Sequence, residues 1–164
     1  MAQIQEPVMG LKPITEPKKY GIYQCAADLA AKIPRFGPVL LASGYVVNHT
    51  YTDTAILGVA LHHVDAAPGA IVDIIVCDDP EQIYEATFDA AVVRADIGSY
   101  APSVVTPANV NDHSGTLLDE SEIGVAAATK LFQIVGLGKT VDGATTKAHV
   151  KIVPSQVDLE IPTS

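Results

Sequence analysis

The sequence predicts a mainly β fold, and three observations support this prediction. The stretch from Gly37 to Glu85 contains four short runs of aliphatic and β-branched residues. Each run is closed by Gly, Pro, Asn or Asp, which is typical of consecutive strands joined by tight turns. The 48% hydrophobic share, with only 5% aromatic residues and no Trp, indicates a core of small aliphatic side chains. The 164 residues are enough for one self-standing domain.

Residues 1–22 predict an extended N-terminal arm rather than a packed element. Pro7, Pro13 and Pro17 interrupt the segment, and each disfavours a helix before it. A disordered linker would seldom carry as many apolar residues as this segment does. The apolar side chains with which the arm is expected to make its contacts are Ile4, Val8, Leu11, Ile14, Tyr20 and Ile22. We expect the arm to become ordered by lying on another subunit, and the alternative is a strap across its own domain.

Residues 23–33 predict one short helix at the start of a single β-rich domain that spans residues 23–164. The segment is rich in Ala, a strong helix former. Cys25, Leu29 and Ile33 would lie on one helical face, and Pro34 would end the helix.

The remaining elements are predicted to be strands and turns. Ser43–Gly44 predicts a hairpin turn, and Pro68–Gly69 predicts another, because Pro presets φ and Gly allows φ > 0. Strands are expected in the runs 71–76, 91–94, 115–118, 131–135 and 148–153, the last of which alternates cleanly. Residues 99–114, rich in Ser, Pro, Asn and Asp, predict a surface loop with short extended pieces, and residues 136–143 predict a turn.

The net charge of −9 is concentrated in the middle of the chain. Residues 48–123 contain 13 acidic residues and one base, Arg94. Such a surface repels phosphate groups, so no direct nucleic-acid partner is expected. No run of 18 apolar residues occurs, and the N-terminus lacks a basic start and an apolar segment, so neither a membrane span nor a secretory signal is expected.

Two groups of polar residues carry the side-chain types that bind metal ions. His62 and His63 stand beside Asp65, but neighbouring strand residues point to opposite faces, so their imidazoles would diverge. The acidic residues from Asp78 to Glu81 could offer oxygen ligands, yet their spacing and Pro80 favour an ordinary turn. We therefore expect no metal ion and no cofactor.

No catalytic residues are predicted either. The run from Gly136 to Thr140 lacks the first glycine of a phosphate loop, because Gln133 occupies that position, and a β-turn is favoured. Ser43 does not lie in the G-x-S-x-G elbow of hydrolases. Cys25 and Cys77 stand in apolar contexts and are expected to be buried thiols, with a disulfide or a redox role as the alternative.

The order of several segments carries a resemblance to a known family. The segments are Val39–Gly44, Ile56–Ala60, Asp65–Gly69, Val72–Val76, Asp96–Gly98 and Leu131–Gly136. In this order they resemble the head decoration (cement) proteins of tailed bacteriophages, over about residues 37–136. The resemblance involves no catalytic motif.

The resemblance implies a small β-barrel or β-sandwich (β-tulip-like) domain that forms a homotrimer. Such a protein is made in the host cytoplasm and sits on the outer surface of the virion. It would clamp neighbouring major capsid proteins, with residues 1–22 as the capsid-binding arm, and it would not be an enzyme. The alternatives are another β-rich virion component (a tail tube, a fibre base or a head–tail joining protein) and a β-module that binds a small ligand.

Overall fold

The computed structural model describes residues 10–28, 32–50, 53–104, 114, 116–138 and 143–153. The chain is mainly β, as the sequence predicts, and its sheets are antiparallel. Within the described residues the only helical segments are two 3₁₀ turns, η1 (Arg94–Asp96) and η2 (Glu120–Glu122).

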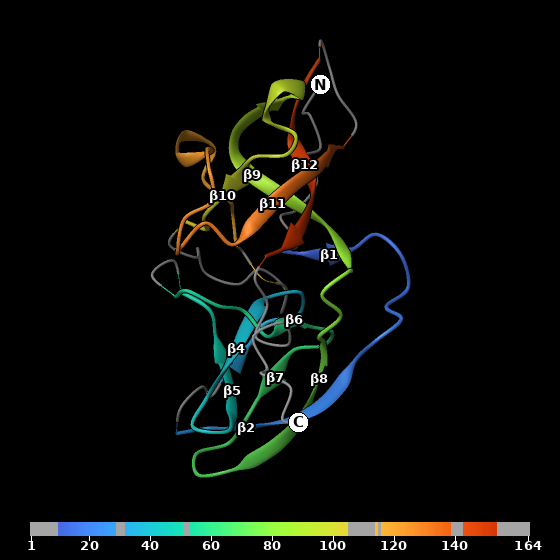
Figure 1. Ribbon diagram of the computed structural model, residues 1–164. Coiled ribbons are helices and arrows are strands. Elements are labelled where there is room, and N and C mark those ends of the chain that lie inside the picture. The colour runs from blue at the N-terminus through green and yellow to red at the C-terminus, as the bar shows by residue number, and fades with distance from the viewer. Residues whose placement is uncertain are drawn as a thin grey trace, which may run out of the picture.

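One five-stranded sheet occupies the upper half of the molecule in Figure 1. In spatial order it contains β1 (Lys12–Pro13), β9 (Ile83–Val93), β12 (Ala144–Ile152), β11 (Phe132–Leu137) and β10 (Tyr100–Ala101). The alternation of β9 explains how it packs, because Tyr84, Ala86 and Phe88 are buried on the same face. β12 is the late strand expected from its alternating sequence, and it pairs with both β9 and β11.

A second five-stranded sheet occupies the lower half of Figure 1. In spatial order it contains β2 (Gly21–Ala26), β8 (Ile71–Cys77), β6 (Gly58–Ala60), β4 (Pro38–Ala42) and β5 (Tyr45–Asn48). A separate pair joins β3 (Lys32–Ile33) to β7 (Val64–Asp65). The predicted hairpin turn connects β4 to β5, where Ser43 and Gly44 both have positive φ.

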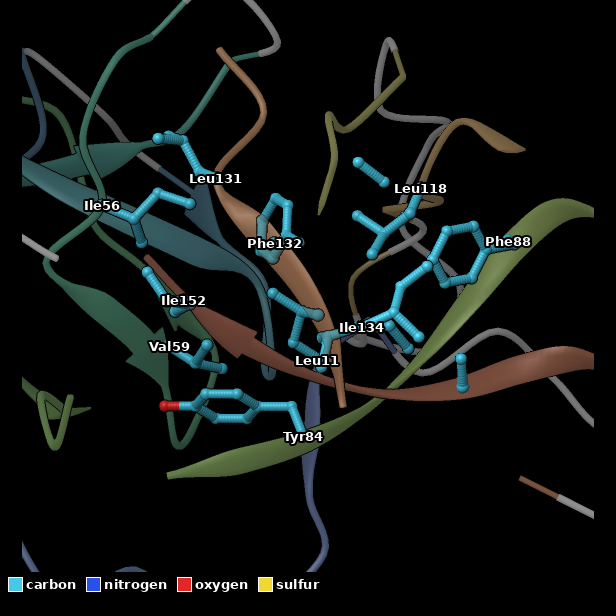
Figure 2. Packing of buried hydrophobic residues seen from close by; sticks show 14 of the residues in the cluster. Leu11, Ile56, Val59, Tyr84, Phe88, Leu118, Leu131, Phe132, Ile134 and Ile152 are labelled. Carbon is cyan, nitrogen blue, oxygen red and sulfur yellow. The ribbon is translucent and has the colours of Figure 1, made fainter. Parts of the chain in front are cut away.

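Each large sheet has its own hydrophobic core, and the described strands form no closed barrel. The first core lies under β9, β11 and β12, and Figure 2 shows Leu11 within it, near Tyr84 and Ile134. Ile56 and Val59, from around β6, belong to this core as well, so it extends between the two sheets. The second core lies between β2, β4, β5 and β8, with Cys25 and Ile74 among its buried residues. The barrel alternative is therefore wrong for the described residues.

The predicted helix at residues 23–33 is wrong. Residues 21–26 form β2, and each of them pairs with a residue of β8, from Gly21 with Val76 to Ala26 with Ile71. The burial alternates with a period of two, since Cys25 is buried whereas Ile22 and Gln24 are exposed. Pairing with a distant strand thus overrides the local helix propensity of Ala. Residues 29–31 lie outside the described residues.

Two further predictions of element boundaries are corrected, and a third agrees with the structure. β11 continues through Gly136 to Leu137, with a bulge between Ile134 and Gly136, so the predicted turn cannot begin at 136. The predicted loop includes the short strand β10, in agreement with the short extended pieces expected there, and residues 105–113 of that loop lie outside the described residues. In the run 116–118 only Leu118 forms bridges, to Phe88 and to Ser103, instead of a full strand.

Candidate functional site

The six apolar residues of the predicted arm have different environments. Ile4 and Val8 lie outside the described residues. Leu11 is 1% exposed and belongs to the first core, and its N–H donates to the carbonyl of Phe36 at 2.9 Å. Leu11 is therefore a core residue and not a contact for another subunit.

The described part of the arm lies along its own domain, as the strap alternative expects. β1 pairs with β9 through Lys12 and Pro13, and the N–H of Ile14 donates to the carbonyl of Ile83 at 3.2 Å. The side chain of Gln82 lies within 3.3 Å of the carbonyl of Thr15. The predicted boundary at residue 22 falls within β2, so the arm and the domain are not separate units there.

The last two residues of the predicted arm belong to an exposed apolar surface on the second sheet. Tyr20 is 61% exposed just before β2, and Ile22 is 70% exposed within it. Paired residues of antiparallel strands share a face, so Ile22 lies on the same face as its partner Ile75. Ile71, paired with Ala26, also lies on this face and is 54% exposed. We call Tyr20, Ile22, Ile71 and Ile75 the β2–β8 surface.

The opposite face of the same strand pair explains why the β2–β8 surface is turned outward. Cys25, Ile74 and Val76 are fully buried in the second core. Because side chains alternate along a strand, the apolar residues between them must point away from that core. The exposed pair Gln24–Asp73 lies on the same face, between Ile22 and Ile71. Exposed aliphatic and aromatic side chains on one face, with polar residues beside them, mark surfaces that bind another macromolecule. This face is therefore the strongest candidate for a functional surface.

The two groups of polar residues with metal-binding side chains make other interactions. His62 Nε2 accepts the N–H of Ile75 at 3.0 Å, and its Nδ1 lies 3.1 Å from the carbonyl oxygen of His63. Asp78 accepts the hydroxyl of Tyr23. Within the ranges that the structure describes, no three His, Cys, Asp or Glu side chains gather in a way that could hold a metal ion.

The acidic turn between β8 and β9 is stabilised locally. The N–H of Glu81 donates to Asp79 Oδ1 at 2.9 Å, the Asx geometry that favours a turn. Lys151 Nζ lies 3.0 Å from Glu81 Oε2 and joins this turn to β12. The turn interpretation of these acids is thus consistent with their contacts.

The structure brings together one histidine and one serine that no spacing in the sequence connects. His49 Nε2 lies 3.1 Å from Ser103 Oγ, and both residues are only 5% exposed. His49 Nδ1 is 3.7 Å from Asp53 Oδ2, too far for a hydrogen bond, and that oxygen already accepts the N–H of Thr50. This geometry differs from a Ser-His-Asp triad, in which the carboxylate orients the imidazole.

His49 joins the two sheets instead. It follows β5, whereas Ser103 follows β10, and its ring meets the ring of Phe132 in β11 edge to face at 6.2 Å. Burial lowers the pKa of His49 to about 4, although the nearby Asp53 carboxylate acts in the opposite direction. His49 is therefore neutral at neutral pH, and protonating it would place a charge in the contact between the sheets.

Both cysteines are buried thiols, in agreement with the sequence prediction. Burial raises the pKa of each thiol. The Cys77 sulfur accepts the Tyr84 hydroxyl at 3.3 Å, which acts in the opposite direction on the pKa of Cys77 but does not outweigh burial. A raised thiol pKa disfavours the reactive thiolate at neutral pH.

In comparisons with known proteins, no family model, no curated protein and no solved structure matches this chain. Among the described residues, no helix is long and apolar enough to cross a membrane.

Proposed function

We propose that this protein is a structural component of a bacteriophage particle that binds the outside of the capsid. It acts as a homotrimer and stabilises the shell by clamping neighbouring copies of the major capsid protein. The observation that carries the proposal is the exposed β2–β8 surface, centred on Ile22 and Ile71. The resemblance of the segment order from residue 37 to residue 136 to head decoration proteins supports the same proposal.

The mechanism follows from the chemistry of that surface. Covering the exposed parts of Ile22 and Ile71 would contribute about 1–2 kcal/mol per side chain, from the apolar area removed from water. A single contact of this strength is weak. A trimer that spans several capsid subunits engages its contacts together, and the combined binding greatly exceeds each separate affinity. The clamp must break before the capsid subunits separate, which is how it would stabilise the shell.

The proposal revises which arm residues meet the capsid. Leu11 is in the core, so the contact residues we propose are Ile14, Tyr20 and Ile22, together with Ile71 from β8. The acidic residues between 48 and 123 would then face solvent or a basic patch of the partner.

The test is co-sedimentation of the purified protein with empty, expanded capsids of the phage that encodes it, after removal of the native copies. We expect the wild-type chain to saturate the shells and Ile22→Ser/Ile71→Ser to lose at least tenfold in affinity. Val125→Ser is the matched control, because Val125 is 84% exposed but lies after η2, at the first sheet. Equal binding by all three proteins would refute the role of the β2–β8 surface.

Solution mass tests the trimer separately. Light scattering should give three times the 17.2 kDa of one chain, either alone or when bound to capsid protein. A monomer in both conditions would refute the trimeric clamp.

A further inference from the structure

A polar pair interrupts the apolar residues of the β2–β8 surface. Gln24 of β2 and Asp73 of β8 are cross-strand partners, and both are exposed on this face between Ile22 and Ile71. We propose that the Gln24–Asp73 pair binds a guanidinium group supplied by an arginine of the capsid protein. This inference rests on the function proposed above and names the chemistry of the partner at the same surface.

The strand register places the two side chains next to each other. The N–H of Ala27 donates to the carbonyl of Ala70 at 3.0 Å, so these two residues continue the register as a hydrogen-bonded pair. Hydrogen-bonded and non-hydrogen-bonded pairs alternate along antiparallel strands, and Gln24–Asp73, three positions away, is therefore a non-hydrogen-bonded pair. The Cβ atoms of such a pair are only about 4.5–5.5 Å apart. The Asp73 carboxylate and the Gln24 amide can thus contact one group together.

The described part of the chain leaves both side chains available. Within it, no base lies within 4 Å of the Asp73 carboxylate, and neither Asp73 nor Gln24 has a side-chain hydrogen bond. A partner that covers Ile22 and Ile71 also removes water from the carboxylate between them. A carboxylate that loses water without gaining a cation is strongly unfavourable. The partner must therefore supply a cation at Asp73.

A guanidinium fits this pair better than an ammonium group does. It presents five N–H donors in a planar fork, two of which can bind both oxygens of the Asp73 carboxylate. A further N–H can reach the side-chain oxygen of Gln24. A guanidinium is also more weakly hydrated than an ammonium group, so it loses less when it is placed between two isoleucines.

The other charges around the β2–β8 surface orient the partner. Lys18 and Lys19 are exposed before the start of β2, with Glu16 as the one acid beside them. Asp28 is exposed beyond the end of β2, at the side of Asp73 away from the lysines. The first end repels further cations of the partner and the second attracts them, so one docking direction is favoured over its reverse.

The experiment is co-sedimentation with the empty, expanded capsids, using Asp73→Asn and Asp73→Asn/Gln24→Glu. Asn has nearly the shape of Asp but no charge, so the single variant leaves the arginine covered without its counter-charge. We expect its affinity to fall at least about thirtyfold. The double variant moves the carboxylate to the neighbouring strand at unchanged net charge, and it should recover at least about tenfold of this loss.

Glu122→Gln is the matched control, because Glu122 is exposed in η2, at the first sheet, and the substitution changes the net charge by the same amount. It should leave the affinity unchanged. Since Gln24 and Asp73 are exposed, all variants should keep the wild-type midpoint of thermal unfolding, which shows that they are folded.

Competition separates a guanidinium from an ammonium group. N-acetyl-arginine amide should release the wild-type chain from capsids at a lower concentration than N-acetyl-lysine amide does. The difference between the two competitors should vanish for Asp73→Asn. Equal competition with the wild-type chain would overturn the assignment to arginine.

A purely apolar partner gives the opposite sign, because Asp73→Asn then removes a carboxylate that loses water and binds more tightly. A gain of affinity, or no change, in Asp73→Asn overturns the inference, and so does a double variant as weak as the single one. If Ile22→Ser/Ile71→Ser still loses affinity in those cases, the proposed role of the β2–β8 surface stands. Equal binding by Ile22→Ser/Ile71→Ser and the wild type instead refutes the role of the surface and this inference together.

Discussion

Acidification should weaken the fold through His49, the residue that joins the two sheets. The pKa of His49 is about 4 in the folded chain, against an ordinary value of 6.5. The folded state thus prefers the neutral imidazole, whereas the unfolded chain takes up a proton as soon as the pH falls below 6.5. The stability that His49 contributes is complete above pH 6.5 and is lost as the pH falls towards 4.

The size of this loss follows from the difference between the two pKa values. Each pKa unit corresponds to about 1.4 kcal/mol, so the free energy of unfolding should fall by about 3 kcal/mol between pH 7 and pH 4 on account of this residue. Carboxylates titrate over part of the same range, and a variant is needed to separate their effect. His49→Gln keeps a polar side chain that can meet Ser103 Oγ but cannot take up a proton in this range.

Urea unfolding followed by far-ultraviolet circular dichroism at pH 7, 6, 5 and 4 provides the assay, since the chain has no Trp for fluorescence. His49→Gln should be less stable than the wild type at pH 7. Between pH 7 and pH 5, however, its free energy of unfolding should fall by about 2 kcal/mol less than that of the wild type. His63→Gln is the control, because His63 is exposed, and it should follow the wild-type slope. Equal slopes for His49→Gln and the wild type would refute the reasoning.

Three further predictions use the same unfolding assay at pH 7. Leu11→Ala should lower the free energy of unfolding by about 2–5 kcal/mol because Leu11 is in the core. Ile14→Ser, on the exposed side of the strap, should lower it by less than about 1 kcal/mol. Similar losses for both variants would contradict the placement of Leu11 in the core. Gly58→Ala should lower the free energy of unfolding by at least about 3 kcal/mol, because a Cβ there would stand 1.9 Å from the Cys77 carbonyl oxygen. Gly124→Ala is the control, because its Cβ would meet only the end of the Lys130 side chain. Unchanged stability of Gly58→Ala would contradict the close approach of Gly58 to Cys77. Ser43→Asn should raise stability by about 0.5 kcal/mol, since Ser43 has a φ of 51° in a two-residue hairpin turn that favours Asn-Gly, and a loss of stability would argue against this turn geometry.

The sequence by itself determined the features that depend on neighbouring residues. The β class, the turn at Ser43–Gly44, the turn that ends at Gly69 and the late strand after residue 144 were all predictable. Turns require positive φ or a preset φ, and residue types that meet this requirement are visible in the sequence. The alternation of residues 148–153 is equally local, because it reflects one buried and one exposed face.

Only the tertiary structure decided what depends on contacts between distant segments. Residues 21–26 became a strand because β8, about fifty positions later, supplied hydrogen-bond partners that local Ala propensity could not reveal. The same pairing turned Ile22 and Ile71 outward together and formed the β2–β8 surface. His49 and Ser103 meet across 54 positions, with no spacing in the sequence that indicates their contact. Register and sheet order are set by packing across the whole molecule, and for this reason the proposed binding surface emerged only from the fold.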